Sequence, residues 1–527
     1  MKNKSTSQSA FFTLRILISL VAILSGVFLA LFATSAQVKR PGPAIKPNSP
    51  SGVGQEWIAF YNGGYGFDVA NGIVVDGSSN IYVTGSSVGP GPCSFYCNDY
   101  ATVKYDASGE QQWVARYNGP ANDDDQPAAI AVDASGNVYV TGASIGTAWP
   151  DYDYATIKYD ASGNQLWVAR YNGPANGMDF ATAIAVDASG NVYVTGASEG
   201  SGTGPHDYAT VKYDSSGQQL WVARYNGPGN GDDEAYGIAV DASGNVYVTG
   251  YSDGSGTGND FATIKYDAAG NQLWVASYNG PSNLDDYGNA IRIDASGNVY
   301  VTGSSVDSVT GFDYATVKYD SSGQEQWVAR YNGPGDEDDE PYAMAVDSSS
   351  NVYVTGYSTG SESGYDYTTI KYDASGNQLW VARYNGDYNL LDIAFAIALD
   401  ACGNVYVTGW SVGPGAGGTS YDYATVKYDS FGQQQWVERY GGAGGDDDQA
   451  YAIAVDSSSN VYVTGYSIGA DGVSSYTTIK YSQSPCGSPT PTPTATATPT
   501  PTATAPPRSS PTPRIRPTPP PRPTPGP

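Results

Sequence analysis

Short runs in which apolar and polar residues alternate recur along most of this chain. One set lies at Ala129–Val132, Asn137–Thr141, Tyr154–Tyr159 and Gln165–Tyr171. Alternation with a period of two indicates half-buried β-strands, and the Val, Tyr, Thr and Trp that dominate these runs favour strands. No stretch within the repeats has the periodicity of a helix. The pattern therefore predicts an all-β protein built from units of four strands.

Two connections in each unit are very short and nearly constant. Asp133–Asn137 joins the first and second strands, and Asp160–Asn164 joins the third and fourth. Asp and Ser open such turns, and Gly supplies the positive φ that a tight hairpin needs. We therefore expect antiparallel hairpins with their turns on one face, and the longer, more variable connections on the other.

The unit recurs eight times, and its phase is offset from the ends of the chain. Its tryptophan returns every 53–56 residues, at Trp57, Trp113, Trp167, Trp221, Trp274, Trp327, Trp380 and Trp436. The first copy contributes only its Trp segment, Glu56–Tyr61, while the last copy ends near Tyr481 without one. This predicts an eight-bladed β-propeller with four antiparallel strands per blade, closed by the Trp57 strand, which completes the last blade. The alternative is a linear solenoid, which would leave its terminal edges exposed.

The segments VDASGNVYVTG and DYATIKYDASGNQLWVARYNG resemble the bacterial β-propeller repeats of the SBBP family. The resemblance covers all eight units. It implies a propeller fold in an exported bacterial protein, and it implies no activity, because no catalytic residue is general to the family. The chain is more faintly similar to quinoprotein-type propellers through Asp160, Gly163 and Trp167. Those enzymes typically add adjacent cysteines at a cofactor pocket, and this sequence has no Cys-Cys pair.

The two ends of the chain indicate export. An apolar run at 16–32 follows basic residues and precedes the small residues 33–36, which predicts a signal peptide over residues 1–36. The run is also long enough for a retained membrane anchor, which is the alternative. We interpret residues 37–54 as a linker, 55–483 as the propeller and 484–527 as a Pro/Thr-rich disordered tail. The predicted location is secreted or at the cell surface.

Four cysteines, Cys93, Cys97, Cys402 and Cys486, are too few and too scattered for a zinc site or a disulfide-built fold. Because export favours disulfides, we expect a Cys402–Cys486 bridge that latches the end of the ring and a local Cys93–Cys97 bridge. The alternative is four free thiols.

The charge of the chain limits its partners. It has 52 acidic and 25 basic residues, a formal net charge of −27. Phosphate contacts need Lys and Arg, so this balance argues against nucleic acid and against membrane contact by the propeller itself. We expect a monomer. The repeated Lys of the KYD segment, such as Lys104, and the Arg of VARY are expected to pair neighbouring blades.

Two sets of aspartates recur at fixed positions on the predicted loop face. One enters the innermost strand of each unit, at Asp68, Asp125, Asp179, Asp233, Asp286, Asp339, Asp392 and Asp448. The other precedes the third strand, at Asp99, Asp153, Asp207, Asp260, Asp313, Asp366 and Asp422, with Ser475 breaking the series.

One hypothesis for these aspartates is calcium coordination at the mouth of the central channel, with Asp125, Asp233, Asp339 and Asp448 as candidate ligands. The other is that each Asp accepts backbone N–H bonds at the start of its strand. Eightfold repetition favours the second hypothesis, so we expect no cofactor, with calcium as the alternative.

Departures from the repeat are the better functional signal. Phe95, Tyr96, Trp149 and Trp410 stand in or beside loops of blades that are close neighbours around the ring, where exposed aromatics would suit a glycan or a protein partner. Trp410 also occupies the position of Tyr251, Tyr357 and Tyr466, which is the alternative of ordinary packing.

The chain has a single histidine, His206, so no Ser–His or Cys–His triad is expected. The sequence therefore predicts an exported, non-catalytic binding or structural module with an extracellular glycan or protein partner. The alternative is a propeller enzyme, acting on carbohydrate or as a quinoprotein-like oxidoreductase.

Overall fold

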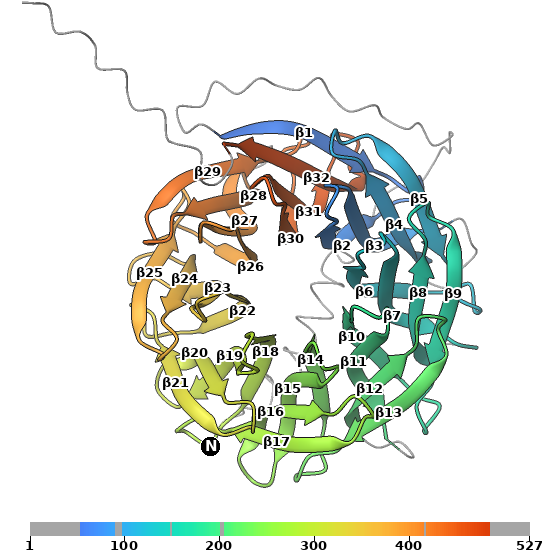
Figure 1. Ribbon diagram of the computed structural model, residues 1–527. Helices are drawn as coiled ribbons and strands as arrows, with labels where there is room; N and C mark the ends of the chain where they lie inside the picture. Colours follow the sequence, from blue (N-terminus) through green and yellow to red (C-terminus); the bar gives the residue numbers. More distant parts are fainter. Residues whose placement is uncertain (1–52, 90–96, 148–149, 201–204, 416–417, 485–527) are drawn as a thin grey trace, which may run out of the picture. The chain divides into compact units, whose positions relative to one another are not determined.

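The computed structural model describes residues 53–89, 97–147, 150–200, 205–415 and 418–484. Within these residues the chain forms 32 strands and no helix. The strands make eight antiparallel sheets of four strands each, arranged as blades around a central axis (Figure 1). The predicted eight-bladed propeller is confirmed.

Blades 1 to 4 each use four consecutive strands, which we call A to D from the centre of the ring outward. Their bounds are β2 Asp68–Val75, β3 Ile81–Val88, β4 Asn98–Tyr105 and β5 Gln111–Tyr117; β6 Asp125–Val132, β7 Val138–Ile145, β8 Tyr152–Tyr159 and β9 Gln165–Tyr171; β10 Asp179–Val186, β11 Val192–Glu199, β12 His206–Tyr213 and β13 Gln219–Tyr225; β14 Asp233–Val240, β15 Val246–Gly254, β16 Gly258–Tyr266 and β17 Gln272–Tyr278.

Blades 5 to 7 follow the same order, and blade 8 takes its D strand from the start of the chain. The bounds are β18 Asp286–Ile293, β19 Val299–Asp307, β20 Gly311–Tyr319 and β21 Glu325–Tyr331; β22 Asp339–Val346, β23 Val352–Thr359, β24 Tyr365–Tyr372 and β25 Gln378–Tyr384; β26 Asp392–Leu399, β27 Val405–Gly415, β28 Gly418–Tyr428 and β29 Gln434–Tyr440; β30 Asp448–Val455, β31 Val461–Ile468, β32 Ser474–Gln483 and β1 Val53–Tyr61.

The ring closes as the phase of the repeats predicts. β1 pairs antiparallel with β32, with Trp57 opposite Lys480 and Tyr61 opposite Tyr476. The Trp57 indole donates to the carbonyl oxygen of Ala107 at 3.2 Å, which joins blade 8 to blade 1. β1 begins at Val53, two residues inside the predicted linker, because Val53 and Gly54 continue this ladder to Gln483.

Strand bounds agree best with the sequence where alternation is unbroken. β9 has the predicted bounds, Gln165–Tyr171. β6 begins at Asp125 instead of Ala129, because a register shift between Pro127 and Ala129 interrupts the period of two. A bulge of this kind hides the first half of the strand from a pattern argument.

Apolar packing lies between blades. The cluster between blades 2 and 3 combines Tyr139 and Tyr154 of one blade with Val192, Val194 and Val211 of the next, all fully buried. Similar clusters lie between the other neighbouring blades, so the long chain needs no single large core.

Blade contacts on the face of the short turns use the repeated Lys and Trp. Lys158 Nζ and the Trp167 indole both donate to the carbonyl oxygen of Ser215 in the next blade, each at 3.2 Å. Lys158 also lies 5.0 Å from the centre of the Tyr139 ring, a cation–π contact within its own blade. The predicted role of the KYD lysine in pairing blades is confirmed.

Several predicted features fall outside the described residues: the signal segment, most of the linker, the Pro/Thr tail, Cys93, Phe95, Tyr96, Trp149 and Cys486. Cys97 and Cys402 are both disulfide-bonded, and their proposed pairing with Cys93 and Cys486 stays a prediction. None of the residues that the structure describes forms a helix long and apolar enough to cross a membrane.

Candidate binding face

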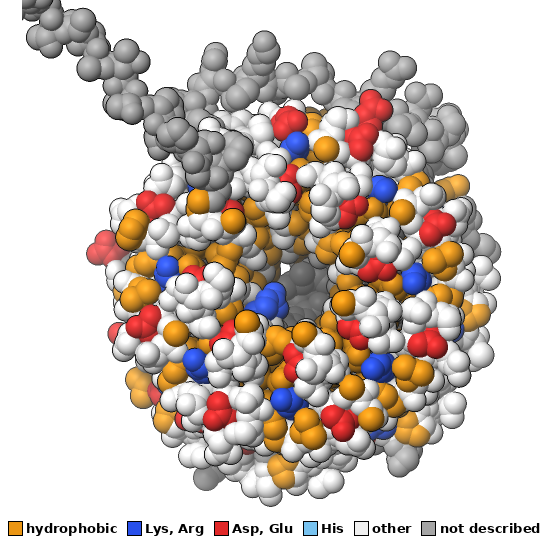
Figure 2. All heavy atoms as spheres, in the orientation of Figure 1, with side chains coloured by type: hydrophobic (Ala, Val, Ile, Leu, Met, Phe, Trp, Pro, Cys, Tyr) orange, Lys and Arg blue, Asp and Glu red, His pale blue; other side chains and the backbone are white. Residues whose placement is uncertain are grey.

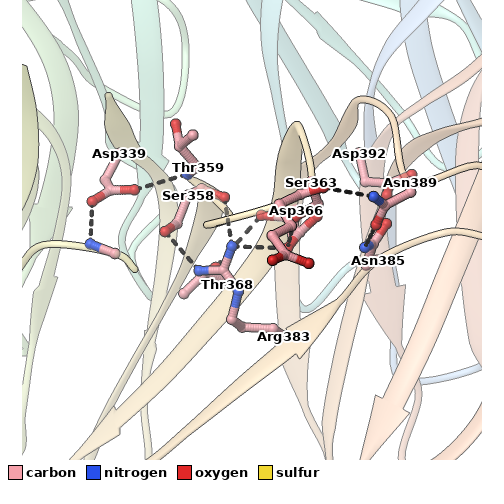
Figure 3. Close-up of polar contacts among 12 residues, drawn as sticks. Asp339, Ser358, Thr359, Ser363, Asp366, Thr368, Arg383, Asn385, Asn389 and Asp392 are labelled. Atoms are coloured by element: carbon pink, nitrogen blue, oxygen red, sulfur yellow. Dashed lines mark hydrogen bonds and ion pairs between the residues drawn. The ribbon is translucent and has the colours of Figure 1, made fainter. Parts of the chain in front are cut away.

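One row of polar residues crosses each blade near the face of the longer loops, which we call the loop face. In blade 6, Asp339 of strand A pairs with Ser358 of strand B, which pairs with Asp366 of strand C. Arg383 of strand D reaches this row and donates to Ser358 Oγ at 2.7 Å and to Asp366 Oδ2 at 2.8 Å (Figure 3). It also donates to the hydroxyl of Tyr331 in the preceding blade at 3.4 Å.

The same Arg–Asp pair recurs in six blades, with nitrogen–oxygen distances of 2.7–2.9 Å. The pairs are Arg116–Asp99, Arg170–Asp153, Arg224–Asp207, Arg330–Asp313, Arg383–Asp366 and Arg439–Asp422. In these blades the second aspartates pair with a side chain and not with the backbone N–H groups expected, while the calcium hypothesis stays a prediction. The partner is an arginine 17 residues later in the chain. Its bond to a tyrosine of the preceding blade confirms the predicted blade-pairing role of the VARY arginine.

The aspartates that begin strand A, which we call the ring aspartates, are all buried. Each accepts a hydrogen bond from the backbone of a glycine in the loop before it, as Asp233 does from Gly227 at 2.7 Å. The backbone-acceptor hypothesis is therefore confirmed for this set. The ring aspartates were also expected at the channel mouth, but at most 1% of each residue is exposed.

Burial controls the titration of the ring aspartates. It raises the pKa of Asp68, Asp179, Asp286, Asp339, Asp392 and Asp448 to about 6, although hydrogen bonds from Ser and Gly oppose the shift. The pKa of Asp125 rises to about 7 for the same reason. The calcium candidates Asp125, Asp233, Asp339 and Asp448 belong to four separate blades. Among the described residues no three His, Cys, Asp or Glu side chains are placed to hold a metal ion.

The acidic runs on the loop face also join neighbouring blades. The residue just before the ring aspartate accepts a hydrogen bond from the preceding blade: His206 N to Asp232 at 3.0 Å, Asn259 N to Asp285 at 3.0 Å and Phe312 N to Asp338 at 3.1 Å. Sequence reasoning missed this role. The signal that could have revealed it is the recurrence of Asp at this position, 26 residues after its donor.

The described part of the predicted aromatic patch offers little surface to a ligand. Trp410 exposes 8% of its area and packs against Tyr421, with ring centres 4.3 Å apart. This is the ordinary packing that its tyrosine equivalents imply.

Blade 4 departs from the row in one residue. Ser277 stands where six other blades have arginine, while Tyr225, Ser252 and Asp260 keep their places. Blade 8 departs in two, because Phe60 replaces the arginine and Ser475 replaces the aspartate. Blade 8 therefore loses both charges, whereas blade 4 keeps the acid without its base.

The repeat described as the SBBP β-propeller repeat matches the chain six times, over residues 57–92, 112–147, 166–202, 220–256, 326–362 and 435–472. The chain is a propeller of SBBP repeats. Each match begins at the Trp of a D strand or one residue before it, and runs past strand B of the following blade. The D strand of blade 4, which carries Ser277, lies outside the matched segments.

No curated protein matches the sequence of this SBBP propeller. Solved structures with a similar chain path include a lignostilbene dioxygenase from Pseudomonas brassicacearum, with 11% identity and a TM-score of 0.39, covering 71% of this chain and 92% of that one. An ulvan lyase has 11% identity and a TM-score of 0.35, covering 76% and 92%. A luciferin-regenerating enzyme has 15% identity and a TM-score of 0.32, covering 55% and 84%. At these scores the likenesses carry no inference about activity.

Hydrophobic side chains are common around the centre of the visible face of the SBBP propeller (Figure 2). The visible face is hollowed there, and acidic and basic side chains are scattered around the blades without forming one charged patch (Figure 2). On strand A of blade 5, Arg292 is exposed and stands where blades 2 and 3 have Ala131 and Ala185. Its guanidinium donates to the backbone carbonyl oxygen of Ile291 at 2.7 Å.

Proposed function

We propose that this SBBP propeller is an exported binding or structural module that acts at the cell surface or outside the cell, without catalysis and without a resident cofactor. Its partner is a glycan or a protein bound at the loop face. The observation that supports this proposal best is that the repeated polar side chains bond to the protein itself. The lysines, arginines and most aspartates of each unit are bonded within and between blades, so the differences between blades are concentrated in the loops.

The single histidine fits a structural role. The His206 backbone donates to Asp232 of the next blade, and its Nδ1 lies 3.5 Å from the same carboxylate. The carboxylate and other acids nearby raise the pKa of His206 despite the opposing effect of burial. His206 thus joins blades 3 and 4 in the way other backbone donors join other blades, which favours a binding module over a His-dependent enzyme.

A binding screen with the full chain tests the proposed function. The protein would be applied to immobilised glycans and to exported proteins, and each hit would be measured for saturable binding and for chemical change of the bound molecule. Saturable binding that a loop-face substitution weakens, and that the turn-face control Asp160→Asn retains, is the expected result. Turnover that disappears when one loop-face carboxylate is replaced would contradict the proposal and favour the enzyme alternative.

A further inference from the structure

The polar row of blade 4 keeps the acceptors of a guanidinium group but has no arginine. In the six complete blades, one guanidinium bonds the Ser hydroxyl of strand B, the Asp of strand C and, in the preceding blade, the Tyr hydroxyl of strand D. Blade 4 has Ser252, Asp260 and Tyr225 at these positions. Ser277, at the arginine position, is too short to reach them and is exposed.

Two atoms of this row have no hydrogen-bond partner among the described residues. Ser252 is only 3% exposed, and its Oγ has no partner of suitable geometry. Asp260 Oδ1 is also buried without a partner, but so is the matching oxygen of Asp99, Asp153 and Asp366 in complete blades, and Thr257 donates to Asp260 Oδ2 at 3.0 Å. Ser252 Oγ is therefore the atom that distinguishes blade 4, because an arginine donates to the equivalent Ser hydroxyl in the complete blades. Leaving a buried polar atom unsatisfied costs free energy, so a ligand that donates to Ser252 Oγ recovers that cost.

Within the part of the chain that the structure describes, the carboxylate of Asp260 forms no ion pair, unlike its equivalents in the six complete blades. Burial raises its pKa, and the neighbouring Asp253 and Asp285 raise it further. Blade 8 shows that the protein tolerates loss of the pair when both members are replaced together, by Phe60 and Ser475. Blade 4 retains only the acid. A partly buried carboxylate is unfavourable unless a cation pairs with it.

The guanidinium position is accessible from solvent. In the complete blades the arginine side chains are 23–27% exposed, while the side chains of their Asp partners are only 5–13% exposed. The carboxylate therefore forms the floor of the site, and the guanidinium approaches it from outside. A cation on the end of a partner's side chain can approach the same floor in blade 4.

We propose that Tyr225, Ser252 and Asp260 form a site for one arginine side chain presented by a partner protein. This deepens the proposed function, on which it rests, by naming the chemistry of the partner. Arginine is favoured over lysine because a planar guanidinium donates in several fixed directions, as Arg383 does to Ser358, Asp366 and Tyr331. The partner's arginine would supply the guanidinium group that the six complete blades have in their own D strands.

The first experiment titrates the full chain with acetyl-arginine amide, measured by calorimetry and by ligand-observed NMR. Acetyl-citrulline amide has nearly the same shape without the charge, and acetyl-lysine amide has the charge without the fork. We expect saturable binding of the arginine compound to one site, with the other two at least about tenfold weaker because they lose the charge or the paired hydrogen bonds. Equal binding of all three compounds would overturn the proposal.

Two substitutions locate the site. Ser277→Arg places a guanidinium over Asp260 from within the chain, so it should abolish binding of acetyl-arginine amide and raise Tm. The matched control Phe60→Arg adds the same residue to blade 8, where Ser475 offers no carboxylate, and should leave both binding and Tm nearly unchanged. Asp260→Asn should weaken binding while the fold is retained. Undiminished binding in Ser277→Arg, or a lower Tm, would contradict the assignment.

The same variants separate this proposal from the proposed function. A partner found in the binding screen should lose affinity for Ser277→Arg and keep it for Phe60→Arg. A partner that binds both variants equally leaves the proposed function standing and overturns the arginine site. If no partner binds the wild-type chain, the proposed function fails, while the titration with acetyl-arginine amide still decides whether blade 4 accepts a guanidinium.

Discussion

The two faces of the ring use the same residue in opposite ways. On the turn face, Asp133 accepts hydrogen bonds from the backbone of Ser135 and Asn137 and from the side chains of Asn137 and Tyr139, at 2.7–2.9 Å. Burial alone would raise its pKa, but these bonds outweigh burial and hold the pKa below its usual value. On the loop face, Asp125 has a buried Oδ1 without a partner among the described residues, and burial raises its pKa to about 7.

The difference lies in where the partners come from. The turn aspartate is satisfied by residues two to six positions away, so each turn completes its own bonding before the blades assemble. The loop-face row depends on residues 17 to 55 positions apart that meet only in the assembled ring. One substitution can therefore leave a loop-face row incomplete while the fold persists, as in blade 4, and such positions are where binding sites can arise.

A change in pH should affect the stability contributed by the two faces in opposite directions, and this is the largest effect expected. A ring aspartate whose folded pKa is near 6 binds more protons in the folded than in the unfolded state, where its pKa is 3.8. These groups stabilise the fold increasingly as pH falls from about 7 to about 4. Turn aspartates have lowered folded pKa values, so the stability they contribute is present above the unfolded pKa and is lost as pH falls below it. Tm should rise from pH 8 to about pH 5 and then fall steeply below about pH 4.

Thermal unfolding followed by circular dichroism across this pH range checks the expectation. Asp125→Asn removes one titrating ring group without changing its shape, so it should flatten the rise between pH 8 and 5. A Tm that falls steadily from pH 8 downward would contradict the raised pKa values of the ring.

Removing one arginine from a complete row should be the most costly single substitution considered. Arg383→Met leaves Asp366 and Ser358 without their principal donor, and we expect a loss of about 3 kcal/mol in the free energy of unfolding. Ser277→Ala at the same position of blade 4 removes no such bond and should change stability by less than about 0.5 kcal/mol. Denaturant unfolding of both variants measures the difference. Equal losses would mean that the row contributes nothing through its charges.

These effects mark the limit of what the sequence could reveal. Trp57 and its seven equivalents predicted the number of blades and their closure, because period and phase are properties of the sequence alone. Turn residues such as Asp133 and Gly163 were assigned correctly because their partners are local. The pairing of Asp366 with Arg383 was missed, since only the register of strands C and D brings the two together. The incomplete row of blade 4 became interpretable only when that pairing was known.

Substitution of the glycine in the turn between strands C and D should destabilise the turn face by an intermediate amount. Gly163 has a φ of 85°, and a Cβ added there would lie 2.7 Å from Trp113 of the preceding blade. Gly163→Ala combines backbone strain with a steric clash, and we expect a loss of about 2 kcal/mol. Ser162→Ala, one residue earlier, keeps the backbone amide that bonds Asp160 and should have little effect. A stable Gly163→Ala variant would show that the indole can move without disturbing the contact between blades.

The smallest expected effect comes from a single turn aspartate. Asp133→Ala removes four hydrogen bonds, but water can replace those of the exposed Ser135 amide, so the net loss should be about 1 kcal/mol. Most of that loss should come from the hydroxyl of Tyr139, whose ring is buried beneath Lys158 and which bonds Asp133 at 2.9 Å. Because the double variant Asp133→Ala with Tyr139→Phe no longer buries a hydroxyl without its acceptor, it should be at least as stable as Asp133→Ala alone in denaturant unfolding. A further loss in the double variant would show that the Tyr139 hydroxyl finds another partner, and that a turn aspartate is less self-sufficient than its bonds suggest.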